Sequence, residues 1–253
     1  MGAGIAGTDI AIADNLTTRD LFAALAAGWR DFLAKPQYGL FFAAFYAFSG
    51  VVLYYLFMVR GEAVWLIAAV AGFPLLAPFT AVGLYEVSRR RDRGMEMGWP
   101  AILGALGGRG DHQLLLIGGI IFVGFAFWVI IAHMIFAIFS ASAGLGEGMV
   151  FLRSTTGLTM LAFGGAVGAG IAFLFYAMTV MSLPMLVDRD VDFITAIIAS
   201  FKALGNNFAV LLLWAVMIAL ALFAAILPLF VGLFVVLPVL GHATWHLYRR
   251  TVT

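Results

Sequence analysis

Long apolar runs alternate with short polar segments along most of the chain. A helix needs about 20 apolar residues to cross the hydrocarbon core of a bilayer. A tight turn is expected near Pro228, because one apolar run ends at Leu227 and the next begins at Leu229. The run Leu158–Val187 is long for one span and is expected to tilt or to bend at Pro184. The predicted fold class is an all-α membrane protein with six transmembrane helices. The six runs are Tyr38–Val59, Ala63–Tyr85, Leu114–Ser140, Leu158–Val187, Phe208–Leu227 and Leu229–Tyr248.

The composition agrees with this pattern. Of the 253 residues, 64% are apolar and only 11% are charged, whereas soluble domains carry roughly a quarter charged residues. The mean hydropathy is +1.08. The chain has no cysteine, which excludes disulfides, thiol catalysis and thiolate metal sites. The net charge of +1 gives no indication of a nucleic-acid partner. Met1–Thr17 has no basic signal-peptide region, so the first apolar run is expected to direct insertion and remain in place.

The basic residues are distributed unevenly between the two sides of the predicted spans. Twelve of the 14 lie in the segments that flank the six spans on one side, and only Arg60 and Arg153 lie in the opposite loops. Cytoplasmic loops carry the excess of Lys and Arg. The pattern predicts that both termini are cytoplasmic and that the chain lies in a bacterial inner membrane.

Two short segments resemble each other and are too short to cross a membrane. Asp20–Phe32 and Asp192–Leu204 align without a gap, and each places its apolar residues on one helical face. Gly98–Leu106 is a weaker third copy. These patterns predict amphipathic helices that lie in the cytoplasmic interface. The expected membrane-interface anchors are Trp29, Arg30, Trp99, Phe201, Lys202, Trp245, Tyr248, Arg249 and Arg250.

A Pro-x-Leu motif occurs at Pro74, Pro184 and Pro238, near the cytoplasmic end of every second span. Together with the amphipathic segments, it predicts one unit used three times, in which an interfacial helix precedes a transmembrane hairpin. The units cover about 18–94, 95–190 and 191–250 of a single domain, 18–250, after a flexible N-terminal segment, 1–17. The alternative is that membrane sequences resemble one another by composition.

Three histidines are candidates for chemistry. His242 and His246 are four residues apart, on one helix face, where they could hold a metal or haem. However, the two other repeats have Pro78 and Asp188 at the position of His242, and an aromatic and basic belt surrounds His246. Interfacial anchoring is therefore the favoured interpretation, with no cofactor or metal expected. His133 lies within the third span, either as a functional group or as a neutral imidazole hydrogen-bonded inside the bundle.

Other marks have structural interpretations beside functional ones. Gly164 and Gly168 form a small-xxx-small pair, which favours helix packing within the bundle over a homo-oligomer interface. Ser88–Glu96 is expected to be a solvated, polybasic loop, with contact of Arg89, Arg90 and Arg91 with anionic headgroups as the functional interpretation. Asp190 or Asp192 is expected to cap the helix that follows, with a divalent cation site as the alternative.

The chain resembles a domain-of-unknown-function family of predicted bacterial integral membrane proteins, frequent in proteobacteria. The resemblance covers nearly all of the chain and implies no activity. Some family members carry a label of cytochrome c oxidase subunit I, but haem–copper subunits have many more spans and ligand histidines than the four histidines of this chain. The stretches that carry the resemblance are AAGWRDF, GFPLLAPFTAVGLYEVSRR, SLPMLVDRDVDFITA and VLPVLGHATWHLYRR.

No nucleotide-binding glycine motif, zinc-protease motif or serine nucleophile elbow is present. The sequence therefore favours a non-catalytic scaffold, accessory or assembly factor that acts by helix packing and lipid contact. Its expected partners are the lipid bilayer and either another membrane protein or a second copy of the chain. One alternative is a channel, carrier or lipid-handling protein with a path between the hairpins. The second alternative is a haem- or quinone-interacting accessory of a respiratory complex.

Overall fold

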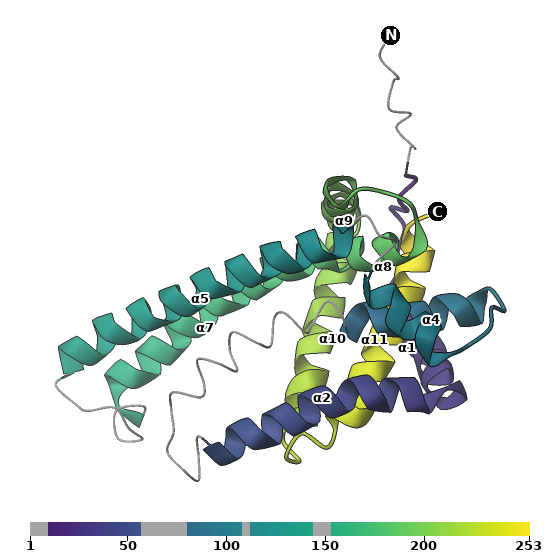
Figure 1. Ribbon diagram of the computed structural model, residues 1–253. Coiled ribbons are helices and arrows are strands. Elements are labelled where there is room, and N and C mark those ends of the chain that lie inside the picture. Colours follow the sequence, from purple (N-terminus) through teal and green to yellow (C-terminus); the bar gives the residue numbers. More distant parts are fainter. Residues whose placement is uncertain (1–9, 57–79, 108–111, 144–152) are drawn as a thin grey trace.

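The computed structural model describes residues 10–56, 80–107, 112–143 and 153–253 (Figure 1). This part of the chain is helical, apart from short connections and one isolated β-bridge between Ile12 and Val252, so the all-α class is confirmed. Residues 80–92 are also helical, and a 3-10 turn covers Ala105–Gly107. The remaining helices are α1 (Thr18–Ala34), α2 (Pro36–Tyr54), α4 (Trp99–Gly104), α5 (Gln113–Ala143), α7 (Thr155–Thr179), α8 (Ser182–Asp188), α9 (Phe193–Asn206), α10 (Phe208–Ile226) and α11 (Leu233–Thr251).

Within the described residues, four helical segments are long and apolar enough to cross a membrane. They correspond to the first, third, fourth and fifth of the six predicted spans. The second predicted span, Ala63–Tyr85, lies largely outside the described residues. The arrangement as six spans in three hairpins therefore stays a prediction. The four segments are Pro36–Tyr54, Gln113–Ala141, Thr155–Asp188 and Phe208–Ile226.

The sixth predicted span forms α11, which is not one of those four segments. Its C-terminal half is rich in polar side chains, and most of them are buried against other helices. The tight turn expected near Pro228 is confirmed, since residues 227–232 form turns. Leu229 and Phe230 have left-handed φ angles of 51° and 67°, which side chains larger than glycine rarely adopt. The α10–α11 connection is therefore short and strained.

The fourth predicted span is interrupted as expected, but the break lies before Pro184 and not at it. Helix α7 ends at Thr179 and α8 begins at Ser182, with a turn at Val180 and Met181. Proline has no N–H group to bond the carbonyl four residues earlier, and its ring clashes with that carbonyl. For Pro184 that carbonyl belongs to Val180, where the turn forms.

Two regions differ in how they are packed (Figure 1). Helices α1, α8, α9, α10, α11 and 80–92 form what we term the body. Helices α5 and α7 run side by side away from it, and we term them the arm. The beginning of α5, at Leu114 and Ile117, and the end of α7, at Ala177, share the core of the body. The arm is therefore attached at one end.

Helices α1 and α11 approach each other closely in the body. A Cβ atom at Gly28 would lie 2.6 Å from the backbone nitrogen of Ala243 and 2.6 Å from the carbonyl oxygen of Val239. Only glycine allows two helix backbones to come so near. This contact brings the side chains of α1 within reach of those on α11.

Residues 10–17 are tied to the body, which differs from the expected flexible segment 1–17; residues 1–9 lie outside the described part. The backbone nitrogen of Ala13 donates to the carbonyl oxygen of Thr251 at 2.9 Å. The backbone nitrogen of Leu16 donates to Oδ1 of Asn207 at 3.0 Å, and Leu16 is buried. Residues 10–17 therefore lie beside the C-terminus of the chain. Their own sequence has no regular pattern, and these long-range contacts hold them in place.

The amphipathic segments form helices where the pattern predicted them, as α1 and α9. The third copy forms only the short α4 and the 3-10 turn. Thr17 and Asp20 make a capping box at the start of α1. Asp192 caps α9, since its side chain accepts a hydrogen bond from the backbone nitrogen of Thr195 at 2.9 Å; the predicted cap is confirmed there. The threefold repeat itself stays a prediction.

Candidate functional site: a buried layer of carboxylates and arginines

Three carboxylates are buried in the body, at Asp31 of α1, Glu86 of helix 80–92 and Asp188 of α8. Buried carboxylates require partners, because the loss of hydration costs several kcal/mol per charge. Each of the three is bonded by arginine. We term these carboxylates and the side chains that bond them the polar layer. Its basic members are Arg89, Arg90, Arg91, Arg93, Arg189, Arg249 and His246.

Glu86 finds its partners within its own helix. Nε of Arg89 and Nε of Arg90 each lie 2.7 Å from its carboxylate. Residues three and four positions apart share one helix face, so this part of the layer follows from local sequence.

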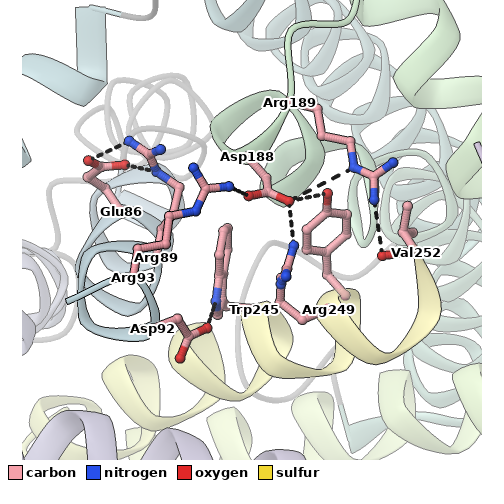
Figure 2. A network of polar contacts seen from close by, with 10 residues as sticks. Glu86, Arg89, Asp92, Arg93, Asp188, Arg189, Trp245, Arg249 and Val252 are labelled. Atoms are coloured by element: carbon pink, nitrogen blue, oxygen red, sulfur yellow. Dashed lines mark hydrogen bonds and ion pairs between the residues drawn. The ribbon is translucent and has the colours of Figure 1, made fainter. Parts of the chain in front are cut away.

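Asp188 joins three elements (Figure 2). Arg93, just after helix 80–92, donates to its Oδ1 at 2.5 Å. Arg249 of α11 donates to its Oδ2 at 2.9 Å, and the hydroxyl of Tyr248 donates to the same oxygen at 3.0 Å. Figure 2 shows Asp188 at the centre of these contacts, with Arg93 and Arg249 directed toward it. The carboxylate therefore fixes α8 against α11.

Asp31 lies at the centre of a second group. The hydroxyl of Ser88 donates to its Oδ2 at 2.6 Å, Nε2 of His246 lies 2.8 Å from the same oxygen, and Arg91 pairs with Oδ1. Burial raises the pKa of Asp31, but the hydrogen bonds from His246 and Ser88 favour the charged form, and the net pKa lies below its ordinary value. Asp31 is therefore a carboxylate in the folded chain.

His242 extends this group into the interior. Its Nδ1 lies 2.8 Å from the hydroxyl oxygen of Ser88, and its side chain is fully buried. The one hydroxyl proton of Ser88 is directed to Asp31, so Nδ1 of His242 must be the donor in its contact. Nε2 has no hydrogen-bond partner among the described residues. An imidazolium there would leave a charged N–H group unpaired, so the neutral ring, with a bare Nε2, fits the site.

The two histidines therefore belong to one chain of hydrogen bonds, from His242 through Ser88 and Asp31 to His246. Nδ1 of His242 and Nε2 of His246 are the ring nitrogens that take part in this chain. Among the described residues, no group of three or more His, Cys, Asp or Glu side chains is placed to hold a metal ion.

The structure places the two aromatic residues of the expected C-terminal belt inside the body, which differs from the prediction. Trp245 and Tyr248 are 1% and 0% exposed. The indole nitrogen of Trp245 donates to Oδ2 of Asp92 at 2.8 Å (Figure 2). Arg249 is half-exposed and pairs with Asp188, as described above. Both aromatic rings lie on the face of α11 that packs against helix 80–92 and α8, which an aromatic and basic composition alone does not indicate.

The polybasic stretch also differs from its prediction. Residues up to 92 are helical, so Ser88–Glu96 is not a loop throughout. Arg89 and Arg90 are largely buried and face Glu86, whereas Arg91 is 38% exposed and pairs with Asp31. Intramolecular pairing therefore occupies Arg89 and Arg90, whereas Arg91 pairs with Asp31 and still presents part of its side chain to the outside.

The remaining expected anchors lie on the surface. Trp29, Trp99 and Phe201 are about two-fifths exposed, and their neighbours Arg30 and Lys202 are also exposed. Arg250, at the end of α11, pairs with Asp20 of α1 at 3.1 Å. These positions are accessible to a lipid headgroup, and their contact with lipid stays a prediction.

His133 is exposed on the arm and not enclosed in a bundle. Its Nδ1 lies 2.8 Å from the carbonyl oxygen of Val129, one turn earlier in α5. Gly164 and Gly168 both face α5: a Cβ atom would lie 3.7 Å from the side chain of Ile135 at Gly164 and 2.9 Å from that of Trp128 at Gly168. The glycine pair therefore packs α7 onto α5 within the chain.

Sequence reasoning missed Asp31, Glu86, Asp188 and Ser88 as a group. One signal was present: each acidic residue stands beside apolar residues in a helix, where a buried charge requires a partner. Their partners come from separate segments in two of the three cases, so no spacing rule connects them.

The comparison with protein families gives one match. Residues 66–188 match the family described as Predicted integral membrane protein (DUF2189). The match covers just under half of the chain, including Glu86 and Asp188 but neither Asp31 nor α11. Together with the four apolar helices, it supports an integral membrane protein. No match was found among curated proteins or among solved structures.

Proposed function

We propose that this chain is a non-catalytic membrane scaffold, an accessory or assembly factor whose arm is the contact surface. The observation that carries the proposal is the exposure of the arm. Large apolar side chains are exposed around both of its helices, such as Phe127, Ile138, Leu158 and Leu174. A helix that is apolar all round is suited to lipid or to other membrane helices.

The polar layer supports a structural role over catalysis. Its three carboxylates are paired with arginines, and Ser88, which lies beside a histidine, is fully buried and directs its proton to Asp31. A nucleophile requires an accessible oxygen and a free base. The layer instead connects α1, helix 80–92, α8 and α11 into one unit from which the arm extends.

We further propose six spans in three hairpins, with both termini in the cytoplasm of a bacterial inner membrane. The four apolar helices, the asymmetry of the basic residues and the hydrogen bonds between residues 11–13 and the C-terminus support this orientation. The chain has no cysteine, so single substitutions give clean accessibility probes. Arg153→Cys should react with an impermeant thiol reagent in intact cells, and Thr253→Cys only after lysis. The reverse pattern would overturn the orientation.

The scaffold role is tested by cross-linking in the native membrane. A photoreactive amino acid at Phe127, Ile130 or Ile138 of the arm should give a discrete protein adduct. Leu220 on α10 is the matched control, because it is similarly exposed and apolar but lies outside the arm. Adducts with lipid alone at all four positions would refute the scaffold role.

A lipid-handling role is the second candidate, favoured by one observation. An apolar cavity of about 420 Å³ lies between α2, α10, α11 and the start of helix 80–92. Its walls include Leu53, Ala81, Leu222 and Leu237. If the cavity carries lipid, Ala81→Phe should slow redistribution of a fluorescent lipid between the leaflets of liposomes that contain the chain. If the wild-type chain and Ala81→Phe both gave the rate of protein-free liposomes, the result would favour the scaffold.

A further inference from the structure

A polar pocket of about 300 Å³ opens between α1, the end of helix 80–92 and α11. It lies beside the Asp31 group but is open to the outside. Two guanidinium groups and two carboxylates surround the same space, so the formal charge of its walls is balanced when His246 is neutral. The lining residues are Ala27, Arg30, Asp31, Arg91, Asp92 and His246.

Not all of these groups are occupied by one another. Asp31 is saturated by Ser88, His246 and Arg91. Asp92, in contrast, uses only Oδ2, which accepts from Trp245, and its Oδ1 has no partner in the described part of the chain. Arg30 is exposed and makes no hydrogen bond or ion pair with another described residue. The pocket therefore offers one unpaired guanidinium and one unpaired carboxylate oxygen.

From this juxtaposition we propose that the pocket binds a phosphate ester that carries a primary ammonium group, of the phosphoethanolamine type. Arg30 and the outer N–H groups of Arg91 bind the phosphate, since guanidinium matches phosphate oxygens in pairs. Oδ1 of Asp92 accepts from the ammonium. Asp92 would repel a purely anionic ligand, and Arg30 would repel a purely cationic one. The mixed charges of the walls therefore select a zwitterion.

The position of the pocket identifies a lipid headgroup as the source of this chemistry over the free compound. Phe22, Trp29 and Leu33 form an exposed apolar stripe along α1, next to Arg30. Helix α2, a candidate span, begins at Pro36, directly after α1. Where an exposed apolar stripe meets the entry of a span, the helix lies at the level of the headgroups.

The test is calorimetric titration of the full chain in detergent with short-chain lipids. The probes are dihexanoyl-phosphatidylethanolamine, its phosphatidylcholine and phosphatidylglycerol counterparts, and free phosphoethanolamine. The ethanolamine lipid should bind most tightly, because choline has no N–H group to donate and glycerol has no positive charge. Free phosphoethanolamine should bind more weakly than the lipid; equal binding would refute the lipid as the ligand and leave the soluble compound. Tighter binding of the glycerol lipid would refute the zwitterion site.

Two variants locate the binding. Arg30→Gln should weaken binding of the ethanolamine lipid about five- to tenfold. Asp92→Asn keeps an acceptor for Trp245 but removes the negative charge, so it should abolish the preference for ethanolamine over glycerol. Arg19→Gln is the control, since Arg19 is exposed on α1 outside the pocket. Unchanged affinities in both variants, with unchanged thermal unfolding, would overturn the proposal. The arm takes no part in this experiment, so its outcome is independent of the scaffold role.

Discussion

The body and the arm are both helical and largely apolar, yet different interactions hold them together. In the body, α1 and α11 approach until their backbones touch at Gly28, and buried carboxylates connect the surrounding helices. In the arm, α5 and α7 share a single seam, and many of their large side chains are exposed. The body is therefore specified by contacts within the chain, whereas the arm requires an apolar environment to cover it.

This difference shows that a low content of charged residues is compatible with two different ways of packing helices. The buried carboxylates of the body lie where four elements meet, and burial makes each of them consequential. The described helices of the arm carry no Asp, Glu, Lys or Arg. Their hydrogen bonds to the body, through Gln113, Tyr176 and Ala177, lie at the attached end. Farther out, packing of small residues such as Gly168 against Trp128 holds the two helices together.

The largest effect is expected from Gly28→Ala. The added Cβ would lie 2.6 Å from two backbone atoms of α11, which cannot move aside as a side chain can. The free energy of unfolding, measured by titration with SDS, should fall by about 3 kcal/mol, the upper end of the usual cost of overpacking. Gly165→Ala in the arm is the matched control, because no atom of the described residues outside its own helix lies within 4 Å of its Cβ position. A loss of equal size in both variants would contradict the distinction between body and arm.

Asp31→Asn is expected to have the next largest effect. It preserves the size of the side chain but removes the charge that Arg91, Ser88 and His246 share. The unfolding free energy should fall by about 1–3 kcal/mol, because buried donors lose an acceptor. Asp190→Asn, at an exposed position, should leave it unchanged. If the two substitutions had the same effect, the polar layer would not be a source of stability.

Acid should weaken the body over a defined range of pH. The pKa of Asp31 in the folded chain lies below its ordinary value of 3.8, the balance of burial, which raises it, and hydrogen bonds from His246 and Ser88, which lower it. Its contribution is therefore complete above pH 3.8 and is lost as the pH falls through the folded pKa. Thermal unfolding in detergent should shift to lower temperature below about pH 4. The shift should be smaller in Asp31→Asn; an identical pH profile would assign it to other groups.

Gly168→Ala should have the smallest effect. The added Cβ would lie 2.9 Å from the far end of the Trp128 side chain, which can rotate away. Alanine also favours the helix by up to about 1 kcal/mol, so the unfolding free energy should change by less than about 1 kcal/mol. A loss as large as that of Gly28→Ala would show that the arm is as tightly specified as the body.

Features that depend on near neighbours could be predicted from the sequence. The turn near Pro228, the interruption before Pro184 and the cap at Asp192 each follow from a proline or from a side chain within four residues. The pairing of Glu86 with Arg89 and Arg90 has the same local origin, although the polybasic stretch was interpreted as a loop. The candidate site could not be predicted, because Asp31 meets Arg91 and His246 only after three distant segments have packed.

The sequence by itself determined that this is an all-helical chain suited to a membrane. The length and spacing of its apolar runs reflect the solvent around each helix and do not depend on tertiary contacts. It also determined the amphipathic character of α1 and α9. Only the tertiary structure decided which polar side chains of the C-terminal helix face inward. Trp245, Tyr248 and His242 have the composition of a membrane-interface belt. However, the close contact at Gly28 brings α1 against α11. The carboxylates of α1 and α8 then pair with His246, Tyr248 and Arg249 inside the body. Polar side chains can bond to water, to lipid or to other groups of the chain, and the tertiary structure decides which of these partners lie within reach.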